Sequence, residues 1–163
     1  MNVLILPTAE HYFEGLRNVL DEVAREKRYL AFTQATPLEQ AYSFFRNIVT
    51  NDLCQFVALQ EGDVVGWCDV LPMHGEARAH VGTFGIGVVS HARHIGIGTK
   101  LMEAALLKAW NNGITRIELT VRTDNQIATA LYERFGFTHE GLNRNAFFID
   151  GKYYDTYTMA LLR

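Results

Sequence analysis

The 163-residue sequence is poor in cysteine, in net charge and in long apolar runs. Its two cysteines, Cys54 and Cys68, both stand within apolar stretches, which favours buried reduced thiols over a disulfide or a metal pair. A formal net charge of −3 gives no general reason to expect a nucleic-acid partner. No stretch approaches the roughly 20 apolar residues of a membrane span. The histidines lack the H-x-x-x-H and H-E-x-x-H spacings, so no metal site is expected.

What the sequence does contain is enough apolar residues for one ordinary domain. Hydrophobic residues make up 48% of the chain, and its length suits a single core, so residues 1–163 are expected to form one domain. The apolar start Met1–Leu6 is too short for the core of a signal peptide and stops at Pro7. We therefore expect a soluble, cytoplasmic protein without a membrane partner.

The pattern of the first third predicts a strand followed by two helices. Asn2–Leu6 is a short apolar strand, and Thr8 is placed to cap a first helix. That helix frays in the charged run Arg25–Arg28, which is predicted to be a solvated face. Residues Thr36–Glu39 fit a capping box at the start of a second helix. The segment between the two helices, about Tyr29–Pro37, could line a substrate pocket.

The remainder alternates strands with helices and ends in two long strands. Strands are predicted at Cys54–Gln60, Val64–Leu71, His80–Val89, Ile114–Val121, Phe137–Ile149 and Lys152–Leu162, and helices at Thr99–Asn112 and Asn125–Phe135. Glu61-Gly62-Asp63 and Asp150-Gly151 are hairpin turns, and Asp124 is placed to cap the last helix. The order β-α-α-β-β-β-α-β-α-β-β predicts a mixed α/β (α+β) fold of about seven strands and four helices.

A glycine-rich turn joins a strand to a helix near the middle of the chain. Helix N-termini expose unpaired N–H groups, and Gly96 and Gly98 lack a Cβ, so a bulky pyrophosphate could approach the backbone. The dinucleotide pattern G-x-G-x-x-G fails because its sixth position is Leu101. The P-loop pattern fails because Thr99-Lys100 stand in the wrong order. The remaining alternatives are the pattern R-x-x-G-x-G, which starts at Arg93, and a plain turn without a ligand.

A second pattern lies along the last predicted helix. Asn125, Ala128 and Tyr132 are spaced i, i+3 and i+7, so they share one face. With Gly136-Phe137 they spell N-x-x-A-x-x-x-Y-x-x-x-G-F. Taken alone, this face is also consistent with an ordinary solvent-facing tyrosine.

Together with the strand end Ile86-Gly87-Val88 and the order of elements, the two patterns resemble the GNAT superfamily of N-acetyltransferases. The C-terminal half is most similar to bacterial L-amino-acid N-acetyltransferases, through Ile117–Val121, Asp124-Asn125 and the ending Tyr153-Tyr154-Asp155-x-Tyr157-x-Met159-Ala160. The resemblance implies a GNAT-like twisted, mixed central sheet flanked by helices. It also implies that the fourth and fifth strands splay apart, with acetyl-CoA lying in the V-shaped gap.

The resemblance further implies a role for each matched residue. The backbone of Ile86 and Val88 would pair with the pantetheine arm like an added strand, and the N–H groups of the glycine turn would hold the pyrophosphate. The implied cofactor-binding residues are Ile86, Gly87, Val88, Arg93, His94, Ile95, Gly96, Ile97, Gly98, Thr99, Asn125, Ala128 and Tyr132.

The implied reaction is direct attack of a neutral amine on the acetyl thioester. Tyr132 matches the family's general acid, and a phenol of pKa about 10 is close enough to a thiol of about 8.5 to protonate a desolvated thiolate. In some relatives, a glutamate that acts as the general base stands where this chain has Thr120. Glu118, two residues earlier on the same face, is the candidate base, and Asp69 and His80 are further candidates. The alternative for Glu118 is an ordinary ion-paired surface carboxylate.

The expected function is therefore N-acetylation of a small-molecule amine, with a free amino acid favoured. The alternatives are acetylation of a protein N-terminus or lysine, and a non-catalytic acetyl-CoA-binding module. The aromatic residues of the final hairpin either bury a homodimer face or pack within the monomer; they are Phe147, Phe148, Tyr153, Tyr154 and Tyr157.

Overall fold

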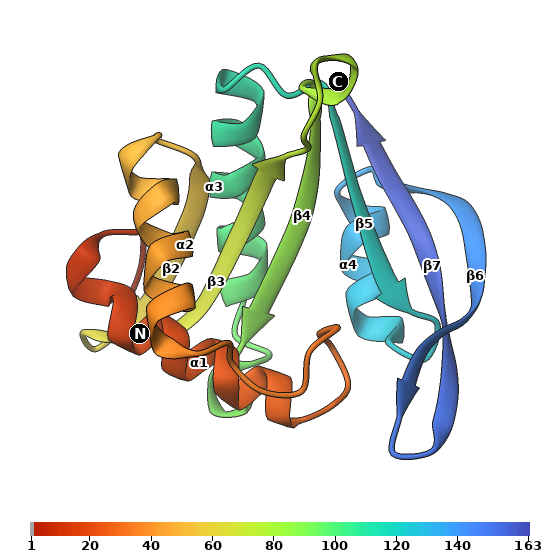
Figure 1. The fold of residues 1–163 in the computed structure, drawn as a ribbon, viewed down its shortest axis with the longest axis horizontal. Coiled ribbons are helices and arrows are strands. Elements are labelled where there is room, and N and C mark those ends of the chain that lie inside the picture. Colours follow the sequence, from red (N-terminus) through yellow and green to blue (C-terminus); the bar gives the residue numbers. More distant parts are fainter. Residues whose placement is uncertain (1) are drawn as a thin grey trace.

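The computed structural model describes residues 2–163, and these form a seven-stranded sheet with helices on both faces (Figure 1). The strands are β1 (Val3–Pro7), β2 (Cys54–Gln60), β3 (Asp63–Pro72), β4 (Val81–Val88), β5 (Arg116–Arg122), β6 (Thr138–Ile149) and β7 (Lys152–Leu162). The α-helices are α1 (Phe13–Arg25), α2 (Leu38–Thr50), α3 (Ile97–Asn111) and α4 (Gln126–Arg134). Short 3-10 turns occupy Glu10–Tyr12, Glu76–Arg78 and Ser90–Ala92. The predicted order of strands and helices is confirmed.

The strand order is β1-β2-β3-β4-β5-β7-β6, and only the β4–β5 pair is parallel. That pair is short: its register covers Val81↔Arg116, Gly82↔Ile117 and Thr83↔Glu118. Beyond Thr83 the two strands diverge, while β4 stays paired with β3 as far as Val88. The expected splay between the fourth and fifth strands is therefore present.

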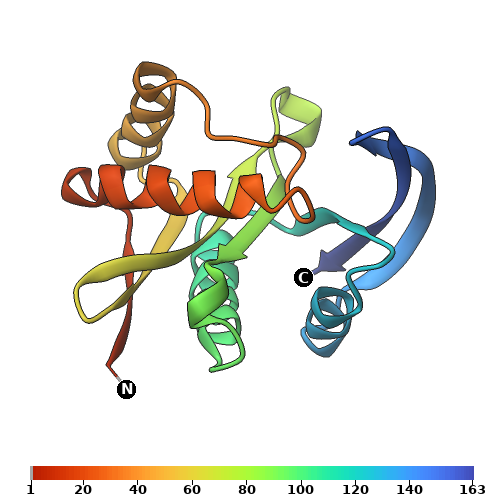
Figure 2. The ribbon, with the colours of Figure 1, turned by 90° about the horizontal axis from the view of Figure 1, so that it is seen from below.

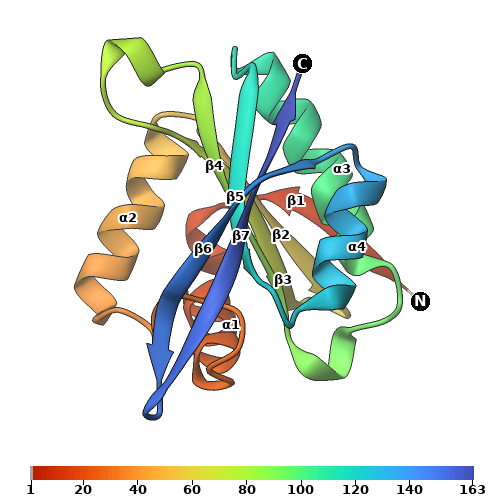
Figure 3. The ribbon, with the colours of Figure 1, turned by 90° about the vertical axis from the view of Figure 1, so that its right-hand side faces the viewer.

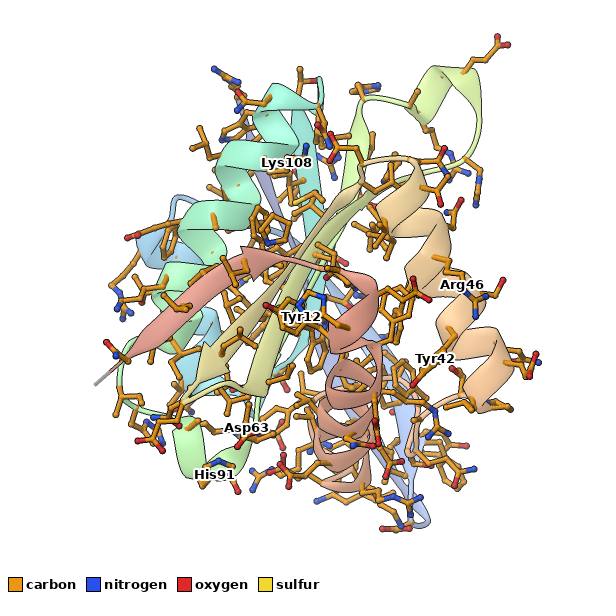
Figure 4. All side chains as sticks on the ribbon, turned by 90° about the vertical axis from the view of Figure 1, so that its left-hand side faces the viewer. Tyr12, Tyr42, Arg46, Asp63, His91 and Lys108 are labelled. Carbon is orange, nitrogen blue, oxygen red and sulfur yellow. The ribbon has the colours of Figure 1, made fainter. Side chains whose placement is uncertain are left out.

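The helices divide between the two faces of the sheet. Seen from below, α1 and α2 lie on one face, here called the α1 face, and α3 and α4 lie on the other, the α3 face (Figure 2). Figure 3 shows the same division from the side of the β6–β7 hairpin, and in Figure 4 Tyr42 on α2 and Lys108 on α3 lie to either side of the strands. Helix α3 buries Leu101, Met102 and Ala105 in the core, at the spacing of one helical face.

Two predicted helix caps in the first third are wrong. Thr8 is buried and its hydroxyl donates to Gln55 Oε1 at 3.0 Å, so it caps no helix, and α1 begins only at Phe13. Helix α2 begins after Pro37, which stands at the N-cap and makes no side-chain capping bond. In both places a tertiary contact or the proline geometry replaces the local hydrogen bond that the sequence suggested.

The start of α4 is also shifted from its prediction. Asn125 is the N-cap, and its side-chain oxygen accepts the Ala128 N–H at 3.2 Å. The carboxylate of Asp124 instead accepts a hydrogen bond from the guanidinium of Arg122, and the distance from Nη2 to Oδ2 is 2.6 Å. A buried arginine is a stronger partner for a carboxylate than a helix terminus, because both groups carry full charges.

The cysteine prediction is confirmed, since Cys54 and Cys68 are buried free thiols. Burial raises the pKa of Cys54 to about 12. Within residues 2–163 there is no helix long and apolar enough to cross a membrane. Over the same residues, no group of three or more His, Cys, Asp or Glu side chains could hold a metal ion.

Candidate active site

A cleft with a volume of about 460 Å³ opens where β4 and β5 part. This size lies within the range of small-molecule sites. The end of β4, the turn into α3, the end of β5, one face of α4 and the segment after α1 all line it. Twelve of the residues expected to bind the cofactor line this cleft: Ile86, Gly87, Val88, Arg93, His94, Gly96, Ile97, Gly98, Thr99, Asn125, Ala128 and Tyr132. Ile95 does not line it, and its side chain is 41% exposed.

Beyond Thr83, the edge of β4 that faces this cleft pairs with no other strand of residues 2–163. The N–H of Val89, just after β4, donates to Val65 O on β3, and the carbonyl of Val81 accepts the N–H of Met73 after β3, so the odd-numbered residues face β3. Because N–H and C=O directions alternate along a strand, the even-numbered residues face the gap. The N–H groups of Ile86 and Val88 therefore point toward the cleft.

The N-terminus of α3 forms the second part of the cleft. Gly96 is its N-cap at φ +87°, a left-handed conformation that favours glycine, and no side chain caps the helix. The first turn contains no acidic residue, and the buried side chain of Ile97 anchors it in the core. The first N–H groups of the helix thus keep their positive field, which suits a diphosphate. A Cβ at Gly98 would lie 3.7 Å from Leu131 on α4, so this glycine widens the passage between the two helices.

Arg93 is not a free cation at the head of this turn. Its Nε donates to the Val88 carbonyl at 2.8 Å, and its Nη1 donates to Glu26 Oε1 at 2.9 Å. Its guanidinium also lies 4.9 Å from the ring centroid of Tyr29. Arg93 therefore connects the turn to the end of α1, and the unpaired charge at this turn comes from the helix N-terminus.

The prediction of the charged run after α1 as a solvated face is wrong at Glu26, while Lys27 is exposed as expected and makes a surface ion pair. Glu26 pairs with Arg93, and Lys27 Nζ lies 3.1 Å from Asp150 Oδ1 at the tip of the β6–β7 hairpin. The carbonyl of Lys27 accepts Arg122 Nη1 at 3.1 Å. These contacts hold the segment after α1 against the far side of the gap, and Arg28 and Tyr29 thereby reach the cleft.

Tyr132 lies at the inner end of the cleft, where its side chain is only 7% exposed. Its ring contacts Phe84 edge-on at 5.6 Å and Phe137 at 5.9 Å between centroids. Burial raises the pKa of the phenol above its usual value, and the nearby Cys68 adds to the shift. The hydroxyl keeps its proton at neutral pH, and because the raised pKa makes it a weaker acid, its proton moves to a thiolate only where burial has raised the basicity of that thiolate as well.

Glu118 does not line the cleft. Its Oε2 accepts Arg116 Nη2 at 3.0 Å, and the same arginine also binds Glu140 at 2.7 Å. The alternative of an ion-paired surface glutamate describes Glu118 in this structure. His80 is exposed and precedes the paired part of β4, at the opposite end of that strand from the glycine turn.

Sequence reasoning missed several lining residues, among them Arg28, Thr120, Arg122 and Leu131. Leu131 and Thr120 could have been found, because they lie close in sequence to residues already matched. Arg28 and Arg122 carry no local pattern, and their position depends on the ties to Lys27 and Asp124.

Comparisons with known proteins agree with this geometry. Residues 17–137 match the acetyltransferase (GNAT) family. The L-amino acid N-acetyltransferase AaaT of Escherichia coli is 36% identical over 111 residues, which are 67% of this chain and 68% of that protein. A GNAT-family acetyltransferase of Streptococcus pneumoniae has a similar structure, with a TM-score of 0.92, 26% identity and coverage of 99% of this chain and 100% of that chain.

A phosphinothricin acetyltransferase of Sinorhizobium meliloti, solved in complex with acetyl-CoA, shares the fold. Its TM-score is 0.91 at 20% identity, and the match covers 99% of this chain and 89% of that chain. The family match spans most of the chain, and the cleft lies where the two central strands splay. The chain therefore belongs to the acetyltransferase (GNAT) family of acetyl-CoA-dependent N-acetyltransferases.

Proposed function

We propose that this protein transfers the acetyl group of acetyl-CoA to the α-amine of a free amino acid. The acceptor class is supported by the similarity to an L-amino acid N-acetyltransferase. The cofactor is supported by the fit of the cleft, which combines an unpaired strand edge with an uncapped helix N-terminus. A cosubstrate with a peptide-like arm and a diphosphate requires both features.

Each part of the cleft has its own task in this proposal. The N–H groups of residues 97–99 hold the diphosphate, and the edge of β4 at Ile86 and Val88 binds the pantetheine amides. The small side chain of Ala128 leaves room on the face of α4. Bound acetyl-CoA supplies the activated acetyl group. A backbone N–H of β4 that faces the gap near Tyr132 stabilises the oxyanion, and Tyr132 donates a proton to the leaving thiolate.

The observation that carries the acceptor class is the position of Arg28. The tie between Lys27 and the tip of the β6–β7 hairpin brings Arg28 into the lining of the cleft. Its neighbour Asp124 is already bound to Arg122. A guanidinium forms strong paired hydrogen bonds with a carboxylate, so Arg28 is the proposed partner of the amino-acid α-carboxylate.

The test is release of free thiol from acetyl-CoA with a panel of acceptors at pH 7 and pH 9. The panel contains amino acids, the amines that result from their decarboxylation, polyamines, aminoglycosides and short peptides. We expect turnover with amino acids and at least 10-fold lower kcat/KM with the decarboxylated amines. Turnover with peptides alone would assign the protein to N-terminal or lysine acetylation, and tight acetyl-CoA binding without turnover would favour the non-catalytic module.

The variant Arg28→Ala examines the carboxylate contact directly. We expect it to raise KM for amino acids by about 10-fold, and to leave KM for a decarboxylated amine unchanged. Arg25→Ala is the matched control, because Arg25 pairs with Asp21 on α1 and does not line the cleft. Equal effects of Arg28→Ala on both kinds of acceptor would reject the proposed contact.

A homodimer and a cytoplasmic location remain proposals. Of the hairpin aromatics, Tyr154 packs under Arg122 and Tyr157 packs on His139, within the monomer. The rings of Phe148 and Tyr153 contact each other at a tilt and are 63% and 57% exposed, so they are the residues that a dimer would cover. Sedimentation of the protein and of Phe148→Ser at the same concentration tests this contact.

A further inference from the structure

A carboxylate that the reaction described so far does not use lies beside β4. Asp69 stands opposite Gly85 in the β3–β4 register. A Cβ added at Gly85 would lie 3.1 Å from Asp69 Oδ1, so this oxygen extends over the backbone of β4. Trp67, two residues earlier on the same side of β3, packs in the same way over Gly87. The glycines of β4 thus leave its backbone open to groups from β3.

The other oxygen of Asp69 is held by a chain of side chains. Gln55 Nε2 donates to Asp69 Oδ2 at 3.1 Å, and Thr8 Oγ1 donates to Gln55 Oε1 at 3.0 Å. Gln55 and Thr8 are both buried. Three elements, the end of β1, β2 and β3, therefore fix the orientation of one carboxylate whose Oδ1 faces β4.

Asp69 and Tyr132 flank the same short stretch of β4 from opposite faces. The Tyr132 ring contacts Phe84 from α4, on the α3 face. Side chains of consecutive residues alternate between faces, so Asp69, next to Gly85, lies on the α1 face. Phe84 and Gly85 are the first residues of β4 beyond its last pair with β5, at the point where the gap begins.

We infer that Asp69 is the general base that removes the proton from the acceptor amine. This inference rests on the proposed function. Asp69 is not itself in the lining of the cleft, but an amine that reaches the start of the gap on the α1 face of β4 would meet its Oδ1 there. The thiolate then leaves on the side of Tyr132. One strand thus separates the group that accepts the first proton from the group that donates the last one.

The proton and bond changes balance as follows. The ammonium R–NH₃⁺ gives one proton to the Asp69 carboxylate, and the neutral nitrogen forms a bond to the acetyl carbon while the carbonyl π pair moves to oxygen. The C–S bond then breaks with its pair on sulfur, which takes the phenolic proton of Tyr132. The second nitrogen proton returns to the Tyr132 oxygen through solvent, and Asp69 releases its proton. The sum is N-acetyl amine, CoA thiol and one proton.

The electrostatic setting of Asp69 suits this role. Burial raises the pKa of Asp69 to about 7, and the hydrogen bond from Gln55 only partly offsets that shift. A base with a pKa near the working pH is the most effective proton acceptor. The titratable groups coupled to Asp69 are Cys54 and Cys68, and burial raises both of their pKa values, so they stay neutral. A limb near pH 7 that is present in the wild type and absent from Asp69→Asn therefore reports Asp69, and its persistence would assign it to another group such as His94 of the cleft lining.

The test compares the wild type with Asp69→Asn from pH 6.5 to pH 9.5, using the best amino acid of the panel. Asparagine keeps the shape and an acceptor oxygen for Gln55. We expect kcat to fall about 100-fold at pH 7 and the wild-type limb near pH 7 to disappear. The defect should shrink toward pH 9.5, because the amine then loses its proton to solvent. Acetyl-CoA affinity should be unchanged, and Asp63→Asn, at the exposed start of the same strand, should behave as wild type.

A second variant, Gly85→Ala, examines the same oxygen without removing it. The added methyl group should push Oδ1 aside and lower kcat several-fold at unchanged acetyl-CoA affinity. A wild-type kcat in Asp69→Asn, or a defect of equal size at every pH, would overturn the assignment while the proposed function stands. No turnover of any amine by the wild type would overturn both.

Discussion

The two walls of the cleft are built in different ways. The coenzyme wall consists of the end of β4, the turn into α3 and one face of α4, and it works through backbone N–H groups and small residues. The proposed acceptor wall is the segment after α1, continued outside the cleft lining by the α1 face around Asp69, and it presents charged side chains from several elements. Contiguous segments form the first wall, so the sequence displays it. Contacts between residues far apart in sequence form the second wall, so local sequence patterns do not predict it.

The two walls meet at one ion pair. Arg93 belongs to the turn of the coenzyme wall, and Glu26 belongs to the segment of the acceptor wall. The sequence separation of 67 residues explains why neither partner indicated the other. This pair is the place where binding of the cosubstrate and closure of the acceptor side would influence each other.

The largest effect is expected for Tyr132→Phe, at the inner end of both walls. Phenylalanine keeps the ring contacts with Phe84 and Phe137 and removes only the donor hydroxyl. We expect kcat to fall about 100-fold, equivalent to about 2.7 kcal/mol, with unchanged acetyl-CoA affinity by calorimetry. Tyr42→Phe on α2 is the matched control. A parallel loss of affinity would place the hydroxyl in binding instead of proton donation.

The next effect concerns stability and separates the acceptor wall from the coenzyme wall. A pKa raised to about 7 means that folded Asp69 holds its proton more tightly than the unfolded chain does. This stabilisation is complete below the unfolded pKa near 3.8 and is lost as the pH rises through about 7. The variant lacks the carboxylate whose ionisation costs stability at high pH. Asp69 is only half-buried, so solvent reduces this cost, and we expect Asp69→Asn to be more stable than the wild type by about 2 kcal/mol at pH 8.

Urea unfolding at pH 4 and pH 8 measures this difference. The difference should be small at pH 4, where the folded aspartate is protonated and the aspartate of the unfolded chain is close to half protonated. A variant that is less stable at both pH values would show that Asp69 mainly holds β2 and β3 together. If Asp69→Asn loses turnover and is also more stable than the wild type at pH 8, then Asp69 is a site residue that is needed for function and that lowers the stability of the fold.

A smaller effect is expected for Gly98→Val, which acts on the coenzyme wall alone. A Cβ at this position would lie at an ordinary contact distance from Leu131, and the two further methyl groups of valine narrow the passage between α3 and α4. We expect acetyl-CoA to bind about 10-fold more weakly by calorimetry, which corresponds to about 1.4 kcal/mol. Gly141→Val, where a Cβ would meet open space on β6, is the control. Unchanged affinity would contradict the placement of the cosubstrate against this turn.

The smallest effect is expected for Glu26→Gln, which breaks the link between the walls. The variant removes a negative charge that neutralises Arg93 beside the proposed diphosphate site. We expect acetyl-CoA to bind about 3-fold more tightly at low salt, and the gain to fade at 0.5 M salt because of screening. Asp52→Asn, which loses only the exposed pair with Lys108, is the control. Weaker binding would mean that the pair serves to orient the turn.

How far the sequence predicted each wall follows from the range of the contacts involved. The glycine turn and the face formed by Asn125, Ala128 and Tyr132 were recognisable because their spacing alone creates a helix N-terminus and a helix face. The caps assigned to Thr8 and Asp124 were wrong because Gln55 and Arg122 offer them better partners. Local patterns show which hydrogen bonds a residue can make, and the tertiary structure decides which bond it does make.

The sequence by itself determined the order of the strands and helices, the hairpin turns and the helix N-terminus that faces the cleft. Hydrophobic periodicity and backbone conformation depend on residues a few positions apart, so the elements they determine can be predicted from the sequence. Only the tertiary structure decided that Glu118 pairs with Arg116, and that Asp69 and Tyr132 lie on opposite sides of β4 at the same point. The position of a charged side chain depends on the partner it meets after folding, and that partner lies far away in sequence.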